Sequence, residues 1–474
     1  MPAPSFLLLP SLALTALAIS ACATVPARGG LADVQRLTAQ RLPQHVVWQA
    51  GLAEDSLGQA YVARQLHGEM PVDSAIQVAL LRNRALQATF EELGLAQADV
   101  VQAGLLSNPI FSGESLVQRG GGRGVQLAGI AWPFIDALQR PLRKRVAERD
   151  FAAARARVAN AVLSLAASVR IAYVDAQSAE QMVEMRATVV QATEASASTA
   201  AALLAAGNLS DLAVAQERAL AADARLELIH ADEASQVARA ELERSMGIAA
   251  DSGWHVSPRL TPPSDSAPVS VAAWEALARV RRLDLRAARY EAEAAARAVG
   301  LARRFALLAD GTIGAAYERE PDGIFRGGTL SIPIPLFDQG QGRTARARAQ
   351  LRQAVARHDA LAVDIGAEVR TTAARTEAAR ARVDQLRRVI LPLRRRIVDE
   401  TQKFVNAMEQ SLFTLLLARQ AEIDAGQSYI GALRDYWMQR AQLERALGGS
   451  FAPLSAAERA EADTSASGPS RSHS

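Results

Sequence analysis

The chain of 474 residues contains one cysteine, few aromatic residues and no long apolar run after its first twenty positions. A single cysteine excludes an internal disulfide. Aromatic residues make up 5 % of the chain although 49 % is hydrophobic, which is typical of long helices packed through small side chains. We find no later stretch of 18 apolar residues, so deeper membrane insertion would have to use strands.

Catalytic and ligand-binding motifs are also missing from the sequence. It has no HExxH, GxSxG or P-loop pattern, and its six histidines and seven methionines are scattered without ligand spacing. We therefore expect no enzyme activity, no metal site and no cofactor. The formal net charge is only +3 and both signs are interspersed, so no nucleic-acid partner is expected; the basic run Arg394–Arg396 is read as a solvated helix face.

The N-terminus resembles a lipoprotein leader. An apolar run from Phe6 to Ile19 predicts a secretory signal over residues 1–21, although no lysine or arginine precedes it. Small residues then lead into Cys22, the only cysteine, which we predict to be the lipidated first residue of the mature chain. Ala23 follows, which favours the outer membrane over the inner one.

The mature chain repeats itself. Residues 218–247 and 419–448 align without a gap at an offset of 201, with 11 of 30 positions identical. Both copies end in Leu-Glu-Arg followed by a glycine, Gly247 or Gly448, at the position where a helix should stop. We predict an N-terminal periplasmic arm at 22–70, repeat 1 at 71–256, a linker at 257–270, repeat 2 at 271–449 and a disordered tail at 450–474.

Each repeat shows the same order of elements: a helix, a strand pair, a very long helix, a tight turn and a helix of middling length. A helix of about 67 residues is roughly 100 Å long and needs neighbours of matching length to bury its apolar stripe. The alanine runs Ala152–Ala154 and Ala200–Ala202 would let such helices approach closely. The predicted helices are 73–106, 139–206 and 211–246 in the first repeat, and 271–308, 342–406 and 411–447 in the second.

The strand pairs are predicted at about 108–134 and about 309–337, with turns at Gly120–Gly122 and Pro321–Gly323. In the second pair, aliphatic residues alternate with small or ring residues, which predicts a strand with one apolar face. These aliphatic residues are Leu330, Ile332, Ile334 and Leu336.

Four strands cannot close a barrel, and an open sheet edge in lipid leaves backbone groups unpaired. If the strands span a membrane, subunits must associate until the sheet closes, and three copies would give twelve strands. Two copies would give eight strands, whose interior would be filled by side chains. The alternative from pattern alone is that both strand pairs are soluble decorations on a coiled-coil protein.

Three motifs resemble the TolC family of outer-membrane efflux proteins. The first is Ala79–Leu86 followed by Asn108-Pro109, which looks like the opening of the family repeat. The second is Pro333–Asp338 with Gly340, similar to the family signature where a strand meets a helix. Its first-half counterpart is Trp132–Asp136. The ending, with Tyr429-Ile430 and Asp435-Tyr436 among its matches, looks closest to the CzcC/CusC heavy-metal efflux subgroup.

The resemblance implies a mainly α fold with a small β part. In that fold, long antiparallel helical hairpins occur in tandem, and four strands per subunit complete a trimeric twelve-stranded outer-membrane β-barrel. It implies a passive exit duct of a tripartite efflux pump, lipid-anchored in the outer membrane and extending into the periplasm. The implied partners are two further copies, a periplasmic adaptor (membrane fusion protein), an inner-membrane RND transporter and outer-membrane lipid.

The two helix-to-helix turns are the predicted functional positions, because in TolC-like proteins they form the periplasmic tip that meets the adaptor. Gly207 and Asn208 permit a left-handed turn, and Ser210 or Asp211 can cap the returning helix, which explains these residues structurally as well. Met408 stands where the family often has a second glycine. Asp211 and Glu409 are candidate entrance acids. The predicted tip residues are Gly207, Asn208, Leu209, Ser210, Met408, Glu409, Gln410 and Ser411.

Two other classes of protein fit parts of the pattern. One is a periplasmic coiled-coil lipoprotein with a structural role and no pore. The other is a pump adaptor, which should show one helical hairpin between lipoyl-like β segments, whereas this chain has two hairpins in tandem.

Overall fold

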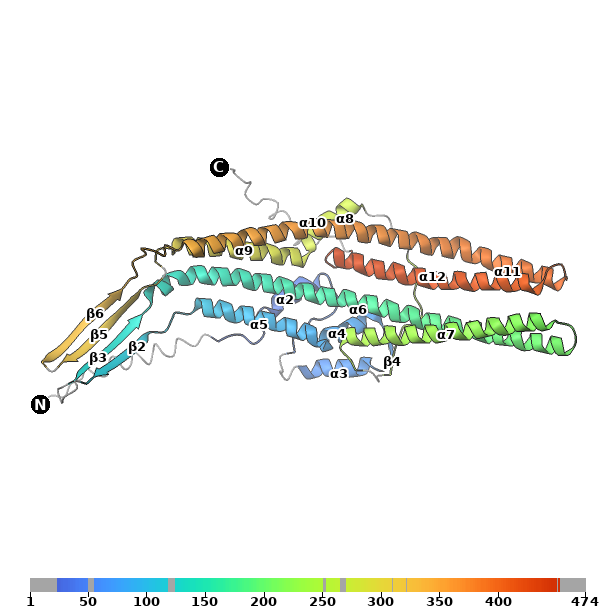
Figure 1. Ribbon diagram of the computed structural model, residues 1–474, viewed down its shortest axis with the longest axis horizontal. Helices are drawn as coiled ribbons and strands as arrows, with labels where there is room; N and C mark the ends of the chain where they lie inside the picture. Colours follow the sequence, from blue (N-terminus) through green and yellow to red (C-terminus); the bar gives the residue numbers. More distant parts are fainter. Residues whose placement is uncertain are drawn as a thin grey trace. The chain divides into compact units, whose positions relative to one another are not determined.

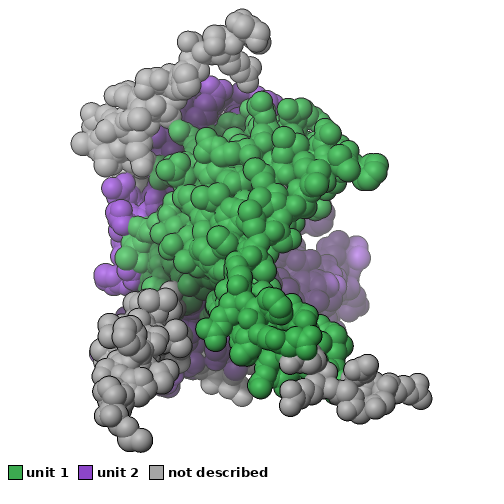
Figure 2. Space-filling model, turned by 90° about the vertical axis from the view of Figure 1, so that its left-hand side faces the viewer, with its two compact units in different colours: residues 1–34, 90–158, 284–360 green, residues 35–89, 159–283, 361–474 purple. Residues whose placement is uncertain are grey.

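The computed structural model describes residues 24–49, 55–117, 124–249, 253–264, 270–308, 310–320, 322–449 and 451. The chain forms two compact units, coloured separately in Figure 2. Unit 1 contains residues 1–34, 90–158 and 284–360, and unit 2 contains residues 35–89, 159–283 and 361–474. The four-stranded sheet therefore belongs to unit 1, and both helix-to-helix turns belong to unit 2.

Both halves of the chain have the predicted order of helices (Figure 1). The first half contains α4 (Val72–Arg82), α5 (Arg84–Gly104), α6 (Phe134–Ala205) and α7 (Asp211–Met246). The second contains α8 (Val271–Arg281), α9 (Leu283–Arg304), α10 (Gln341–Gln385), the π-helical turn η1 (Leu386–Ile390), α11 (Leu391–Asn406) and α12 (Leu412–Ala446).

Helix α6, with 72 residues, contains an 18-residue window apolar enough to cross a membrane by length and composition. Our expectation that the mature chain contains no such stretch is therefore wrong by this measure. The buried core helix of a soluble bundle passes the same test, and 44 % of the window is buried. Ala152, Ala153 and Ala154 are buried as predicted, whereas Ala200 is the only buried member of the second alanine run.

The opening helix of each half is broken, which the sequence did not indicate. We expected one helix over 73–106, but α4 ends at Arg82 and Asn83 is extended, with φ −66° and ψ 109°. Arg282 separates α8 from α9 with nearly the same angles, −60° and 116°. Asn83 also begins the next helix, because its Oδ1 accepts a hydrogen bond from the Leu86 amide at 3.0 Å.

The closing glycine of each half packs against this break. Gly247 and Gly448 are left-handed, with φ values of 71° and 80°. A Cβ on Gly247 would lie 2.8 Å from the carbonyl oxygen of Arg82, and one on Gly448 would lie 2.9 Å from the carbonyl carbon of Arg281. Glycine is therefore required at both positions by conformation and by space.

The sheet joins the two halves in the order β2-β3-β5-β6, with every neighbouring pair antiparallel (Figure 1). Its strands are β2 (Ile110–Leu116), β3 (Val125–Trp132), β5 (Thr312–Glu320) and β6 (Gly323–Ser331). The alternation that we expected to continue to Leu336 is not strand beyond Ser331. Pro333 and Pro335 have no amide hydrogen to donate to a neighbouring strand, which explains the early end.

The arm and the end of the predicted repeat 1 form a small parallel sheet in unit 2. Following α2 (Leu31–Ala39) and α3 (Asp55–Gln65), β1 (Gly68–Met70) pairs with β4 (Trp254–Val256). The buried hydroxyl of Tyr173 donates to the Met70 carbonyl and accepts from the Ser257 amide, each at 2.8 Å. These bonds fix the segment before repeat 1 and the segment after α7 to the long helix.

Candidate functional site: the turns, the helix breaks and the sheet

The first helix-to-helix turn connects α6 to α7. Gly207 has a φ of 75°, and its amide donates to the Leu204 carbonyl at 2.8 Å. The Asn208 amide reaches five residues back to the Leu203 carbonyl at 2.9 Å, which completes a Schellman motif. Ser210 then caps α7, its Oγ accepting from the Ala213 amide at 3.3 Å. Sequence chemistry predicts each of these roles.

The second turn repeats this geometry between α11 and α12. Met408 has a φ of 60° and is the only non-glycine residue with a positive φ in the described part of the chain. Its amide donates to Val405 and the Glu409 amide donates to Phe404, both at 2.9 Å. Ser411 caps α12 by accepting from the Thr414 amide at 3.4 Å. The 201-residue offset of the repeat therefore extends through the turns.

Both turns are exposed at one end of unit 2, where Figure 1 shows them at its right-hand edge. Met408 is 94 % exposed. Large apolar side chains flank both turns and are also exposed; they are Leu203, Leu212, Phe404 and Phe413. These side chains lie in the last turns of α6 and α11 and in the first turns of α7 and α12.

The two candidate entrance acids occupy different places in their turns. Asp211 is the first residue of α7, where a carboxylate is favoured by the helix dipole, and Glu409 lies within the second turn. Both are exposed, and neither forms an ion pair with another described residue. Asp211 thus has a sufficient structural role at the helix start, and Glu409 does not.

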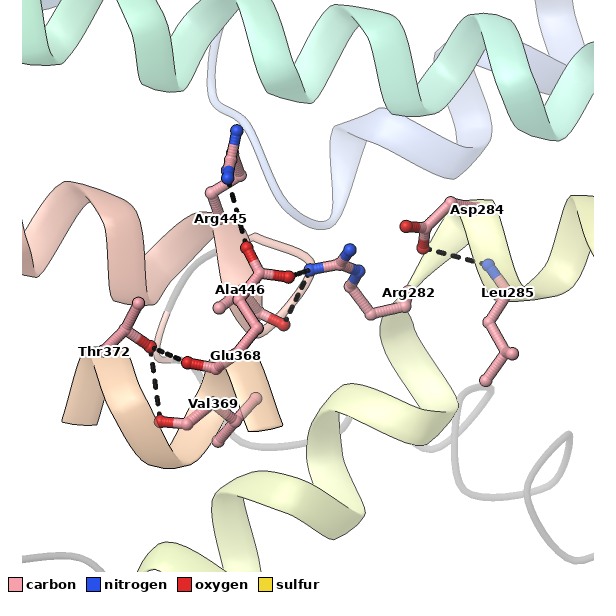
Figure 3. Close-up of polar contacts among 8 residues, drawn as sticks. All are labelled: Arg282, Asp284, Leu285, Glu368, Val369, Thr372, Arg445 and Ala446. Atoms are coloured by element: carbon pink, nitrogen blue, oxygen red, sulfur yellow. Dashed lines mark hydrogen bonds and ion pairs between the residues drawn. The ribbon is translucent and has the colours of Figure 1, made fainter. Parts of the chain in front are cut away.

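The helix breaks hold a polar cluster that the sequence analysis missed. Arg282 donates to Glu368 at 2.7 Å and to the Ala446 carbonyl at 3.3 Å, and Arg445 donates to the other Glu368 oxygen at 3.1 Å (Figure 3). The first half has an uncharged equivalent, because Asn83 donates to the Ser245 carbonyl at 2.9 Å. The side chain at each break therefore bonds the last turn of the helix that returns to it.

An acid also fixes each junction between a strand and a long helix. Asp136, in the first turn of α6, accepts hydrogen bonds from Arg143 and Ser107. The hydrogen bond from Arg143 is the largest influence and, against some desolvation, lowers the pKa of Asp136 below its ordinary value. In the second half, Asp338 accepts from the Gly340 amide at 2.8 Å. These are the two aspartates of the predicted strand-to-helix motifs.

Within the described part of the chain, the four-stranded sheet has two open edges. β2 and β6 each have a single strand neighbour. Large apolar side chains on the strands are exposed, among them Phe111 at 75 % and Leu330 at 65 %. Unpaired edges leave backbone groups of β2 and β6 able to accept further strands.

Several predicted features lie outside the described residues: the signal segment 1–21, Cys22, the turn Gly120–Gly122, Pro321 of the second strand turn, and the tail 450–474 except Phe451. Within the described ranges, no group of three or more His, Cys, Asp or Glu side chains could hold a metal ion.

Residues 75–248 match the family described as "Outer membrane efflux protein". The outer membrane protein VceC from Vibrio cholerae is 20 % identical, with a TM-score of 0.66, over 80 % of this chain and 97 % of that one. The CmeC outer membrane channel of Campylobacter jejuni is 15 % identical, with a TM-score of 0.68, over 83 % of this chain and 89 % of that one.

CusC, described as forming a transmembrane channel, is 16 % identical, with a TM-score of 0.69, over 82 % of this chain and 94 % of that one. At these identities the likeness shows the fold. No curated protein matches the sequence.

Proposed function

We propose that this protein, whose residues 75–248 belong to the outer membrane efflux protein family, is the outer-membrane channel subunit of a tripartite efflux pump. It would conduct substrates passively from a periplasmic adaptor and an inner-membrane RND transporter to the exterior. The single observation that carries the proposal is the four-stranded sheet with two open edges and exposed apolar side chains. The fold shared with VceC, CmeC and CusC supports it.

The number of subunits follows from the number of strands needed to close the sheet into a barrel. Three copies would bring twelve strands together and remove every open edge, which satisfies the backbone in lipid and leaves a central passage. The strands have seven to nine residues. That is close to the roughly 9–11 residues of a tilted membrane strand. A homotrimer with its strands in the outer membrane is therefore the assembly that we propose.

The exposed turns are the proposed adaptor contact. Their apolar flanks and their place at one end of unit 2 suit the docking of a helical partner, and a serine caps the helix that follows each turn. Asp211 and Glu409 are proposed as entrance acids. Photo-crosslinkers at Leu209 and Gln410 should capture the adaptor in cells; no adducts at either turn would remove this assignment.

We also propose that Cys22 carries a lipid and that the protein belongs to the CzcC/CusC heavy-metal efflux subgroup. The lipid would supplement an anchor that a closed barrel already provides. Mass spectrometry of the mature N-terminus tests it: an unmodified Cys22 would disprove lipidation. The subgroup assignment predicts that a deletion strain becomes sensitive to heavy-metal cations and not to drugs, and the reverse sensitivity would contradict it.

Conductance separates the channel from a structural lipoprotein with the same helices. Full-length protein extracted from outer membranes should run as heat-resistant trimers and give discrete conductance steps in planar bilayers. Trimers that never conduct would support a scaffold and would contradict the channel.

A further inference from the structure

The two faces of the four-stranded sheet carry opposite charges. Residues that face each other in the register share a face, and alternate residues along a strand change face. Face A, defined by Phe111, Ile130, Ile313 and Leu330, also carries Arg319 and Arg326 and no acid. Face B, defined by Ser112, Gly129, Ala316 and Gly327, carries Glu114, Glu318 and Glu320 and no base.

Face A is suited to lipid and face B to water. Face A holds the exposed Phe111, Ile130, Ile313, Ile324 and Leu330. Face B exposes the apolar residues Ile110, Leu116 and Phe325, but its middle is formed by small residues, and Glu114 and Glu318 flank Leu127 in one row of the register. An unpaired carboxylate facing lipid is costly, whereas arginine can place its charged head at the membrane boundary. In a closed barrel, face A therefore lies outward.

The two arginines lie together at the end of face A that is distant from the helices. Arg326 is directly opposite Tyr317 in the register, and its guanidinium lies 5.8 Å from the centre of the tyrosine ring. Arg319 is two residues beyond Tyr317 on the same strand and is opposite Ile324. Diagonal neighbours of this kind are about 7–8 Å apart, within reach of one ligand for two long side chains.

Among the described residues, no acid is paired with these two arginines. Neither arginine forms an ion pair with a described residue, and both are exposed. Gln126 lies opposite Arg319 on β3 and adds a polar side chain to the same end of face A. The result is an apolar surface that ends in a tyrosine, an amide and two free guanidinium groups. Guanidinium groups bind phosphate through paired hydrogen bonds, and tyrosine is favoured where a membrane meets water.

We propose that Arg319 and Arg326, with Tyr317 and Gln126, form a binding site for the phosphate groups of an outer-leaflet glycolipid. This inference rests on the proposed function, because it needs the strands to cross the outer membrane with the helices on its periplasmic side. The apolar part of face A contacts the acyl chains, and the arginines bind the phosphates above them. Three copies of the site would surround the rim of the barrel.

Binding of lipid A to the full-length trimer in detergent tests the proposal. The Arg319→Gln/Arg326→Gln variant should bind lipid A about 30-fold more weakly than the unmodified protein. Each basic side chain near an anionic lipid surface strengthens binding about fivefold, and the variant loses two of them. The matched control Arg346→Gln/Arg352→Gln removes the same charge from exposed positions of α10 and should change binding less than about twofold. Equal losses in both variants would show attraction by net charge and would overturn the site.

Further arms identify the ligand. Dephosphorylated lipid A should bind the unmodified protein as weakly as lipid A binds the double variant. Inorganic phosphate at the same concentration should not compete; full competition would show a free-phosphate site instead. Conductance of the double variant separates this inference from the proposed function. Normal lipid A binding in a conducting double variant would overturn the lipid site alone, whereas trimers of unmodified protein that bind lipid A but never conduct would overturn the channel.

Discussion

Met408 has the left-handed backbone conformation of Gly207, the residue 201 positions earlier, and the two turns have the same pattern of backbone hydrogen bonds. A side chain makes this conformation costly by about 1–2 kcal/mol, so the second turn is strained where the first is not. The strain lies at an exposed turn that we propose as an adaptor contact.

Met408→Gly should therefore stabilise the second turn by about 0.5–1 kcal/mol, part of the relief being offset by the greater chain entropy of glycine. Hydrogen exchange of the amides around 404–411 should slow by about two- to fivefold. Gln410→Gly is the matched control. Gln410 has no positive φ, so glycine relieves no strain there and only adds chain flexibility, and the amides of the turn should exchange faster in this variant. Faster exchange in Met408→Gly would show that the turn is not strained.

Gly247→Ala should cost more than Gly207→Ala. Both positions are left-handed, but a Cβ at Gly207 meets nothing within 4 Å, whereas at Gly247 it lies 2.8 Å from the Arg82 oxygen. We expect about 1 kcal/mol for Gly207→Ala and about 3 kcal/mol for Gly247→Ala. Chemical unfolding of the full-length protein measures both. Equal losses would mean that the helix break does not pack against the glycine.

Arg282→Ala should destabilise the protein by about 1–3 kcal/mol, because it removes a hydrogen-bonded ion pair and a bond to the Ala446 carbonyl. The Arg282 side chain is 12 % exposed and its partner Glu368 is 27 % exposed. A double-mutant cycle between them should give a coupling of at least about 1 kcal/mol. The more exposed pair Arg434 and Asp175 serves as the control, with less than about 0.5 kcal/mol expected. Absent coupling at Arg282 would contradict the cluster.

Asp136 should make stability depend on pH. The hydrogen bond with Arg143 lowers the pKa of the Asp136 carboxyl in the folded protein. The stability that Asp136 adds is therefore complete above the pKa of this carboxyl in the unfolded chain, and it is lost as pH falls through the pKa in the folded protein. Asp136→Asn should therefore lose stability at pH 7, and the difference from the unmodified protein should shrink towards pH 3. Asp232→Asn, at an exposed position of α7, is the control. A pH-independent difference would show that the charge of Asp136 is not involved.

The duplicated plan, the turns and the existence of two strand pairs could be predicted from local chemistry. Glycine, asparagine and serine at Gly207–Ser210 define a capped turn by themselves, and the offset of 201 transfers it to the second half. For Met408 the sequence indicates only that methionine stands where the family often has glycine. No neighbouring residue reveals that its φ is positive.

The break at Arg282 could not be predicted, because arginine is an ordinary helix residue and leaves the helix where it bonds the Ala446 carbonyl of α12. The break at Asn83 had a local signal that we missed, since asparagine is a favoured capping residue and caps the next helix through the Leu86 amide. Its bond to the Ser245 carbonyl of α7 is the distant part of the cause. The three-residue pairing of β1 with β4 is too short to show a pattern and depends on contacts with Tyr173. Pro333 and Pro335 are a local signal for the early end of β6. Our prediction followed the apolar alternation instead and therefore extended the strand too far.

Cross-linking the edges of the sheet in the outer membrane tests whether the sheet closes between copies. In a Cys22→Ser background behind a non-lipoprotein signal, Ser112→Cys on β2 is combined with Gly327→Cys, Thr329→Cys or Ser331→Cys on β6. All four positions lie on face B, so a closed barrel brings at least one pair together. Oxidation should then give covalent dimers and trimers, and single-cysteine controls should give no trimers. Monomers from all three pairs in folded, membrane-inserted protein would show that the sheet does not close between copies.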